Sequence, residues 1–563
     1  MLVMPALGSC KKKSFHGSTI PAPVSSIRTV RRYVHTLRHL RAWQVVGRVV
    51  APLRRRWAVR RVPEPPTSLG ATGAARVDFP AHEPWNARED VLLGRFCFLN
   101  ETAELGRPVD WQARDMPLLW RFNLHYFHYL HGLAPDEQVA LCRAWGAANP
   151  PGTGVGWHPY PTALRIVNWC RVGLTAPDLL ASLYRQAAYL HRNLETHVGG
   201  NHLLENARAL VLAGWYLQGQ GEADAWLRRG LAIYRQETGE QVLTDGFHYE
   251  RSPMYHALML EGYLDVLNVL PADHPDRPWL AKAARAMAAA FAGVVQPDGT
   301  LALFNDSTHE IALPPDRLLA YAERVLGEAP RPRTLLPEAG YFVHRGDAVW
   351  LMIDAGPGGP DHLMAHAHAD ALSYELALRG RRFVVDAGVY EYPAGPMRRY
   401  VRSTAAHNTV EVDGSDQIEC WDSFRVARRS APHDVAWRAM ERGAKFEGTF
   451  SGYADRIGDG IRHVRRLTID EAAQTVTVED EVRGRGRHRV ASRIHLHPDV
   501  EVREEGGGAW RLDRNGVACT LAVDAPTVRR ETGWYCPRFG VRTKNTVLVL
   551  QSSGALPTQI GRA

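Results

Sequence analysis

The chain has 563 residues, of which 45% are apolar and 23% are charged, so its length predicts two large domains and its composition excludes global disorder. The net charge of +8 belongs to residues 1–61, which contain 14 Lys and Arg and no Asp or Glu, so the rest of the chain holds 54 basic against 60 acidic residues. This distribution gives no support for nucleic-acid binding by the folded domains, and no apolar run reaches the roughly 18 residues of a membrane-spanning helix.

Residues 1–75 are predicted to form a basic tail and a linker rich in Pro and Gly. Residues 29–56 have helical period and basic side chains on several faces. This pattern suits either peripheral contact with an anionic membrane or packing against the protein body. Lys11–Lys13 follow the short apolar start instead of preceding it, so we expect no signal peptide. We therefore expect a cytoplasmic or membrane-peripheral protein, with a periplasmic or secreted location as the alternative.

Residues 76–330 are predicted to be helical. Apolar residues recur at spacings of three and four in segments such as LLENARALVLAGWYLQG (203–219) and AWLRRGLAIYRQE (225–237). Short turns join these segments, so the region predicts an all-α, repeat-like array or toroid.

Residues 331–563 are predicted to be β structure. Short alternating runs such as YFVHR, HNTVEVDG and QTVTVEDEV are separated by Gly and Asp turns, as in an antiparallel sandwich of ten or more strands. The fold class is therefore multidomain α+β, with a helical domain followed by a β-sandwich. A cleft between the two is the expected place for a functional site.

Two polar segments stand out in the helical region. In GGNHLLENARAL (199–210), His202 and Glu205 share a helix face just after Asn201, which alternatively serves only as a helix N-cap. In DGFHYERSPMYHALML (245–260), two His, two Tyr and an ion pair surround Pro253, and the alternative is a polar loop whose rings cover the core.

In the β region, HAHADALSYEL (366–376) alternates His366, His368 and Asp370, which predicts one strand face. Two His on one face suit a zinc site, with Asp386 or His407 as a third ligand. The alternative is a polar strand face without a ligand. Several arginines between 398 and 429 suit a polyanionic substrate, although solvated sheet faces explain many such residues.

These segments, in this order, resemble those of the heparinase II/III-like polysaccharide lyases. The resemblance rests on WRFNLHYFHYL, WHPYPTALRIVNW, GGNHLLENARAL, DGFHYERSPMYH, DGTLALFNDS, HAHADALSYEL with RRFVVDAG, and RSTAAHNTVEVDG, over residues 110–415. It implies an (α/α) toroid, an antiparallel β-sandwich, and β-elimination at a uronic acid in the cleft between them.

The resemblance also implies roles for particular residues. Asn201 and His202 would hold the uronate carboxyl group, and Glu205 would orient His202. Tyr255 would be the proton shuttle and His366 the second proton acceptor.

One structural zinc ion is implied next to this machinery, with His368, Asp386 and His407 as its ligands. Asp370 would then support one of its neighbours by hydrogen bonding. Arg402 and Asn408, which flank His407 in the sequence, are expected to contact substrate or to support the site.

The sequence thus predicts a bacterial polysaccharide lyase whose partner is an anionic, uronate-containing polysaccharide, either a glycosaminoglycan, alginate or a bacterial exopolysaccharide. One alternative is a glycoside hydrolase on the same helical toroid, with two carboxylates from Glu205, Glu250 and Asp306. The other is a non-catalytic protein that binds exopolysaccharide or assists its synthesis.

Overall fold

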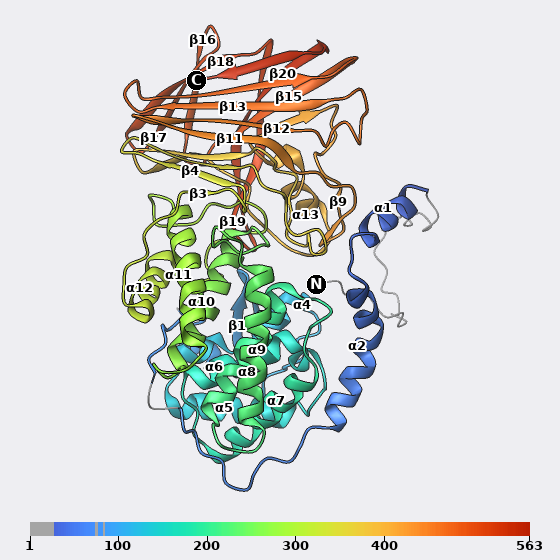
Figure 1. Ribbon diagram of the computed structural model, residues 1–563, viewed down its shortest axis with the longest axis vertical. Helices are drawn as coiled ribbons and strands as arrows, with labels where there is room; N and C mark the ends of the chain where they lie inside the picture. The colour runs from blue at the N-terminus through green and yellow to red at the C-terminus, as the bar shows by residue number, and fades with distance from the viewer. Residues whose placement is uncertain (1–26, 74–76, 83–84) are drawn as a thin grey trace.

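The computed structural model describes residues 27–73, 77–82 and 85–563. A helical part and a part made of antiparallel sheets lie end to end, with the sheets at the top of Figure 1. The last helix of the helical part ends at Leu326, and the first strand of the sheets begins at Leu335. The predicted change from helix to strand near residue 330 falls between these two residues.

The helical part is built around α8, whose side chains are almost all buried. Proline at the first turn begins several of these helices, where its missing N–H costs no hydrogen bond. The helices are α3 (Arg88–Leu93), α4 (Leu118–Leu124), α5 (Pro135–Ala148), α6 (Pro159–Arg171), α7 (Pro177–Arg192), α8 (Gly200–Tyr216), α9 (Ala223–Gln241), α10 (Pro253–Val269), α11 (Arg277–Val294) and α12 (Pro315–Leu326).

A β-hairpin interrupts this region, which the sequence predicted to be entirely helical. Strands β1 (Arg95–Phe98) and β2 (Glu101–Glu104) pair antiparallel. Leu99 and Asn100, between them, both have positive φ (56° and 60°), as in a tight two-residue hairpin turn. Phe96 and Phe98 alternate into the helical core and bury the inner face of the hairpin.

Three antiparallel sheets form the second part. A five-stranded sheet has the order β3–β4–β5–β6–β7, an eight-stranded sheet the order β11–β12–β13–β14–β21–β18–β17–β16, and a four-stranded sheet the order β19–β20–β15–β8. Their bounds are β3 (Leu335–Leu336), β4 (Tyr341–Arg345), β5 (Val349–Asp354), β6 (Tyr374–Leu378), β7 (Arg381–Val384), β8 (Val410–Val412), β11 (Pro432–Met440), β12 (Gly443–Phe450), β13 (Arg462–Asp470), β14 (Thr475–Arg483), β15 (Arg487–His495), β16 (Glu501–Gly506), β17 (Ala509–Arg514), β18 (Val517–Asp524), β19 (Thr527–Arg538), β20 (Val541–Ala555) and β21 (Thr558–Arg562).

The loops between β7 and β11 contain the short helix α13 (Pro396–Val401) and the two-stranded pair β9 (Cys420–Trp421) and β10 (Arg425–Val426). The five-stranded sheet packs directly on the helical part. Phe247, Ala290 and Val294 form one buried cluster with Tyr341, Val343 and Trp350 of that sheet.

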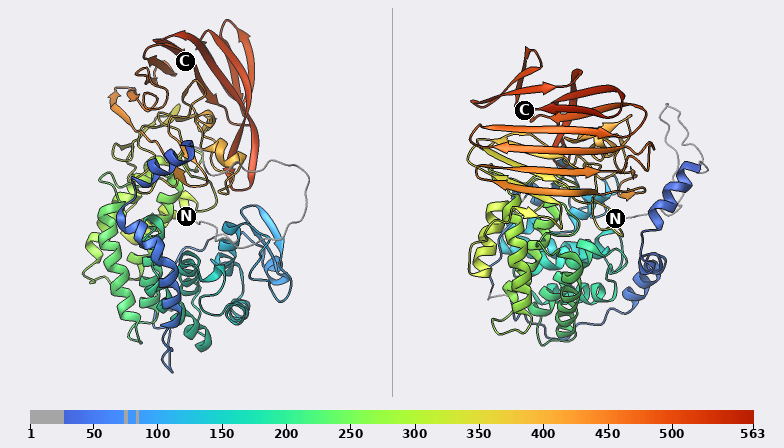
Figure 2. Two further views of the ribbon diagram at one scale, coloured as in Figure 1. Left: turned by 90° about the vertical axis from the view of Figure 1, so that its right-hand side faces the viewer. Right: turned by 45° about the horizontal axis from the view of Figure 1, so that its top comes forward.

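Two helices near the N-terminus lie along the outside of the molecule, α1 (Ile27–Leu37) beside the sheets and α2 (Ala42–Arg60) beside the helical part (Figures 1 and 2). Part of the predicted tail is therefore folded, while residues 1–26 lie outside the described residues. Arg32 of α1 forms a 2.9 Å ion pair with Glu419, and Arg54 of α2 donates to Thr196 at 3.1 Å. Among the helices that the structure describes, none combines the length and apolar character that crossing a membrane requires.

Candidate active site

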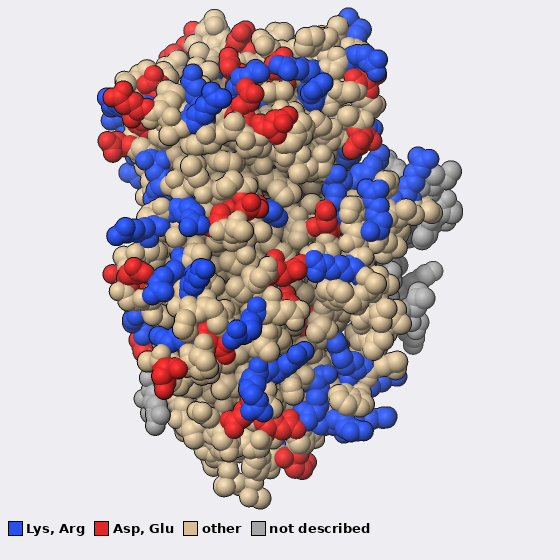
Figure 3. Space-filling model, in the orientation of Figure 1, with Lys and Arg blue, Asp and Glu red and all other residues tan. Residues whose placement is uncertain are grey.

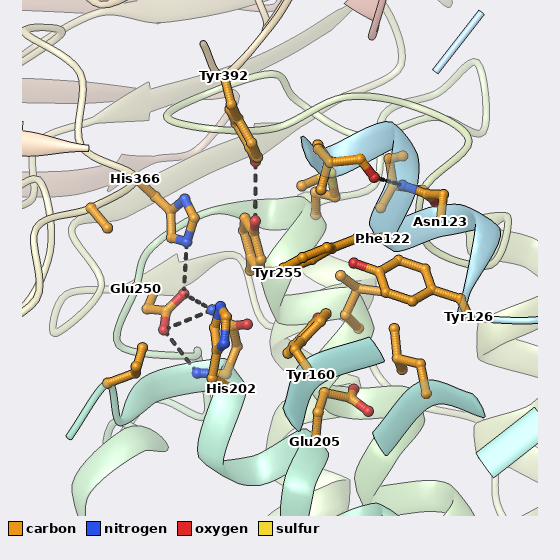
Figure 4. A pocket seen from close by; sticks show the side chains of 18 of the residues that line it. Phe122, Asn123, Tyr126, Tyr160, His202, Glu205, Glu250, Tyr255, His366 and Tyr392 are labelled. Atoms are coloured by element: carbon orange, nitrogen blue, oxygen red, sulfur yellow. Dashed lines mark hydrogen bonds and ion pairs between the residues drawn. The ribbon is translucent and has the colours of Figure 1, made fainter. Parts of the chain in front are cut away.

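A cavity of about 370 Å³ lies between the helical part and the sheets. One wall comes from α4, α6, α8 and α10, and the other from loops of the second part that include His366 and Tyr392 (Figure 4). The four predicted catalytic side chains, Asn201, His202, Tyr255 and His366, all line this cavity. The structure therefore brings together polar residues from both parts of the chain.

Two glycines shape the start of α8. Gly199 and Gly200 have φ values of 71° and 58°, a region that glycine adopts without steric cost. A Cβ atom on Gly200 would overlap Oε1 of Glu250, so only glycine lets this carboxylate approach the helix end. Glu250 accepts hydrogen bonds from the backbone N–H of Asn201 at 3.0 Å and from its side-chain amide at 2.9 Å. A buried carboxylate thus fixes the orientation of Asn201.

The carboxylate that holds His202 is Glu195, and the predicted role of Glu205 is wrong. Nδ1 of His202 lies 3.1 Å from Oε1 of Glu195, in the loop before α8. Glu205 instead forms a 3.3 Å ion pair with Arg208, one turn further along the helix, because this buried guanidinium needs a countercharge. Although burial alone would raise it, His202 and His158 hold the pKa of Glu195 at about 2.

Tyr255 lies in the first turn of α10, where a helix cap fixes it. The Ser252 hydroxyl caps this helix by accepting from the backbone N–H of Tyr255 at 3.2 Å. The phenol oxygen lies 3.0 Å from that of Tyr392 in the opposite wall. Burial raises the pKa of Tyr255 well above its usual range, and Tyr392 and Asp306 raise it further. This phenol is therefore protonated at neutral pH.

His366 stacks on Tyr255 from the opposite wall, with ring centroids 4.0 Å apart. Its Nδ1 lies 2.9 Å from Oδ2 of Asp306, and its Nε2 lies 3.4 Å from Oε2 of Glu250 (Figure 4 shows the second contact). Asp306 is fully buried and also accepts from Arg398 at 2.8 Å. Although burial alone would raise it, Arg398 and the histidines hold the pKa of Asp306 well below its usual range.

The three predicted metal ligands lie together. His368, Asp386 and His407 are buried, and each places one donor atom within 4.8 Å of the other two. Nε2 of His368 bonds to Oδ1 of Asp306 at 2.9 Å, and Nδ1 of His407 bonds to Oδ2 of Asp386 at 2.8 Å. The other nitrogen of each ring is buried without a hydrogen-bond partner among the described residues. Two unpartnered imidazole nitrogens beside a buried carboxylate are a donor set that fits zinc.

The segment that contains His366 and His368 is not the predicted strand. β6 begins only at Tyr374, and residues 365–373 form turns. Their backbone groups bond to other loops, since the N–H of Asp306 donates to the carbonyl of His366 at 3.1 Å. The two histidines still face one side, because both bond to Asp306. Asp370 is buried nearby, and burial raises its pKa to about 6.

Arg402 and Asn408 do not line the cavity, and their predicted contact with substrate is wrong. Arg402 is 2% exposed and donates to the carbonyl oxygen of Ala367 at 3.0 Å, which supports the loop of the two histidines. Asn408 is fully buried and donates to the carbonyls of Tyr374 and Val385, both at 2.9 Å. Both side chains satisfy backbone groups that the irregular loops leave unpaired.

Sequence reasoning missed several residues of this site. Glu195 and Tyr392 lie in loops without a motif of their own, and no spacing links either to its partner. Glu250 entered as part of the ion pair in the segment 245–260, and both Glu250 and Asp306 entered as carboxylates of a hydrolase. A polar Asn-Asp pair after the apolar run LALF was the available signal for Asp306.

Comparison with known families agrees with this geometry. Residues 174–315 match the family model described as Heparinase II/III N-terminus, and residues 328–562 match the one described as Heparinase II/III-like, C-terminal. The chain belongs to the heparinase II/III-like family. The family resemblance inferred from the ordered motifs is confirmed.

Among curated relatives, this heparinase II/III-like chain is 25% identical over 374 residues to the heparin-sulfate lyase of Pedobacter heparinus, covering 56% of this chain and 55% of that protein. It is 28% identical over 256 residues to the heparin-sulfate lyase of Bacteroides stercoris, covering 39% of this chain and 37% of that protein. The match thus spans about half of the length of the first relative and less of the second.

Solved structures of the family show the same fold. The crystal structure of a mutant heparan sulfate lyase from Pedobacter heparinus superimposes with a TM-score of 0.62 at 17% identity, over 96% of this chain and 91% of that one. A heparinase III structure gives a TM-score of 0.66 at 16% identity, over 96% and 92% of the two chains. The predicted α+β class is confirmed.

Proposed function

We propose that this protein is a polysaccharide lyase that cleaves uronate-containing polysaccharides by β-elimination. The observation that supports it best is the stacking of His366 on Tyr255, 4.0 Å apart, in a cavity that Asn201 and His202 also line. A uronate lyase needs donors for the carboxylate, a base for the C5 proton and an acid for the leaving oxygen. We also infer that the helices form an (α/α) toroid and the sheets a sandwich, as the family resemblance implies.

The carboxylate of the sugar is neutralised by Asn201 and His202. In this step His202 acts as an imidazolium, which donates from Nδ1 to Glu195 and from Nε2 to the carboxylate of the sugar. The amide nitrogen of Asn201 has two hydrogens, so one remains for the substrate while Glu250 accepts the other. Hydrogen bonds to the carboxylate strengthen as negative charge moves onto it during removal of the C5 proton.

The two stacked rings share the proton transfers. Because its raised pKa keeps the Tyr255 phenol protonated, this side chain suits the acid that donates to the leaving glycosidic oxygen. His366 donates from Nδ1 to Asp306, which leaves Nε2 as the acceptor for the C5 proton. The substrate test is ultraviolet absorbance of the new C4–C5 alkene on a panel of uronate polymers. Its absence on every polymer would contradict the proposal.

A glycoside hydrolase has less support. Its three candidate carboxylates are each committed to a partner, Glu205 to Arg208, Glu250 to Asn201, and Asp306 to Arg398. His248 and the hydrogen bonds from Asn201 lower the pKa of Glu250 despite its burial, and Arg398 lowers that of Asp306. Burial raises the pKa of Glu205, but its carboxylate pairs with the buried Arg208. A hydrolase requires one carboxyl group that stays protonated near neutral pH.

We propose that His368, Asp386 and His407 hold one zinc ion with a structural role. Zinc bound there would join the loop of His368 to the two segments that follow β7. The ion would supply a rigid anchor beside His366, and the proton transfers use only the side chains named above.

Purified wild-type protein is therefore expected to contain about one zinc per chain, measured by elemental analysis without chelators. His407→Ala should lose most of the zinc and unfold at a lower temperature, since a structural metal contributes directly to folding free energy. His463→Ala is a matched control, because His463 is equally buried but bonds to Asp480 at 2.8 Å away from the metal ligands. This variant should lose stability and keep its zinc. Wild-type protein without zinc would contradict the metal proposal.

The cavity suits a polymer with few charges beyond its uronate carboxylates. Its arginines are all paired, Arg171 and Arg208 with Asp265 at 2.7 and 2.8 Å, and Arg425 with Asp422 at 3.3 Å. No lysine lines it within the described residues. The remaining wall is largely apolar and includes aromatic rings that suit stacking on sugars: Phe122, Tyr126, Tyr160, Tyr392, Phe424 and Phe539.

An unsulfated glucuronate–N-acetylglucosamine polymer should therefore be cleaved faster than its sulfated counterpart. The expected difference in kcat/KM is at least about tenfold, because a buried sulfate would find no uncommitted cation. Initial rates of alkene formation on the two polymers, at matched uronate concentration, measure it. Equal or faster cleavage of the sulfated polymer would show that the cavity accepts sulfate.

A further inference from the structure

The exposed apolar side chains of this protein are concentrated on α1 and α2. Of the thirteen large hydrophobic side chains exposed in the described residues, ten lie on these two helices, and Val49, Leu53 and Val46 are 75%, 64% and 61% exposed. We name the ten the outer face. They are Val30, Val34, Leu37, Trp43, Val45, Val46, Val49, Val50, Leu53 and Trp57. A patch of this kind on a folded protein marks a surface that another body covers.

The residues of the outer face on α2 follow helical spacing, and the other side of this helix packs on the protein. Val46, Val49, Val50 and Leu53 recur at intervals of three and four, so they form one stripe along α2. The opposite side of α2 packs on the helical part, where Ala58 is fully buried and a Cβ on Gly47 would overlap His197. The stripe therefore points outward because the other side of the helix is already docked.

The charged side chains of α1 and α2 themselves are all basic. The first acidic residue of the chain is Glu64, beyond the end of α2. Arg31, Arg56 and Arg60 are exposed and have no carboxylate partner in the part of the chain that the structure describes. Figure 3 shows Lys and Arg gathered along the edge where α1 and α2 lie. Arg61 stacks on Trp57, with 5.6 Å between the guanidinium carbon and the ring centroid.

We propose that α1 and α2 bind an anionic membrane surface through the outer face. Valine and leucine side chains would enter the boundary between headgroups and acyl chains, and the arginines would contact lipid phosphates. Trp43 and Trp57, near the two ends of α2, are of the type that favours the membrane interface. The helices lie in the plane of the membrane instead of crossing it. This inference is independent of the proposed lyase activity.

Vesicle flotation of the full-length protein tests the proposal. Vesicles of phosphatidylcholine with phosphatidylglycerol should bind the protein at least about tenfold more tightly than vesicles of phosphatidylcholine alone, and high salt should weaken that binding. Val49→Gln with Leu53→Gln should reduce binding to the anionic vesicles at least about tenfold, because the apolar contribution is lost. Arg56→Gln with Arg60→Gln should reduce it too and remove much of the salt dependence.

Leu93→Gln is the matched control, because Leu93 is 62% exposed and lies on α3 outside the outer face. It should bind vesicles like wild type. All the substituted side chains are exposed, so the temperature of thermal unfolding should hardly change.

Three outcomes would overturn the proposal. The first is absent binding, or equal binding to the two vesicle types. A dimer in sedimentation velocity that Leu53→Gln dissociates would assign the outer face to a second copy of the chain. Binding of anionic polysaccharide that needs the arginines but neither Val49 nor Leu53 would also overturn it.

Discussion

Replacing Tyr255 with Phe should reduce kcat/KM for alkene formation by about 100- to 10,000-fold, the usual contribution of a positioned general acid. The ring stays in place and keeps its stacking on His366, so the loss reports the hydroxyl alone. Initial rates of alkene absorbance on the best uronate polymer measure the effect. Substrate affinity should change little, since the donors for the carboxylate lie on α8.

Tyr263→Phe provides a matched control on the same helix. Tyr263 is buried in α10, and its hydroxyl lies 2.6 Å from that of Thr238, away from the cavity. Its loss should lower stability slightly and leave the rate within a few fold of wild type. Saturated reducing ends released equally by wild type and Tyr255→Phe, without alkene, would instead indicate a hydrolase.

Asp306→Asn should damage both folding and catalysis. The free energy of unfolding should fall by about 3–5 kcal/mol, because Arg398 would remain buried without its carboxylate. Activity should fall by about 100- to 10,000-fold, since the amide no longer fixes the tautomer of His366. Urea denaturation and alkene rates, both measured where the variant is folded, separate the two effects. A variant that keeps wild-type rates would exclude His366 as an oriented base.

Asp480→Asn is the matched control for this loss. Asp480 is a fully buried carboxylate in the sheets that accepts from His463 and Arg465 at 2.8 and 2.7 Å, so its environment resembles that of Asp306. It should lose comparable stability and retain activity. Asp306→Asn with Arg398→Met removes both buried charges and should recover part of the stability without restoring the rate.

The sequence predicted the features of this protein that depend on local residue patterns, namely the type of secondary structure in each part of the chain. Helical spacing and strand alternation distinguished the two parts of the chain. A helix that buries one face needs apolar residues every three or four positions, and a strand that buries one face needs them at every second position. Gly199 and Gly200 marked the start of α8 by the backbone shape that they allow. The four catalytic candidates came from the family resemblance, and the structure places all of them in one cavity.

The hydrogen-bond and ion-pair partners of the site residues depend on tertiary contacts, which sequence spacing does not reveal. His202 and Glu205 share a helix face, yet Arg208 attracts Glu205, and Glu195 reaches His202 from a loop. Arg402 is close in sequence to His407 but its guanidinium supports backbone carbonyls. The alternation in HAHAD suggested a strand, but the backbone of this segment forms turns because its histidines bond to Asp306 in a neighbouring loop.

The placement of α1 and α2 has a mechanical consequence. α2 is fastened to the helical part through Arg54, while α1 is fastened to the sheet part through Arg32 and through the ring of Tyr33, 4.9 Å from that of Trp421. A single arm therefore braces both sides of the cavity from outside. Widening the cavity by hinge rotation would require one end of this brace to detach.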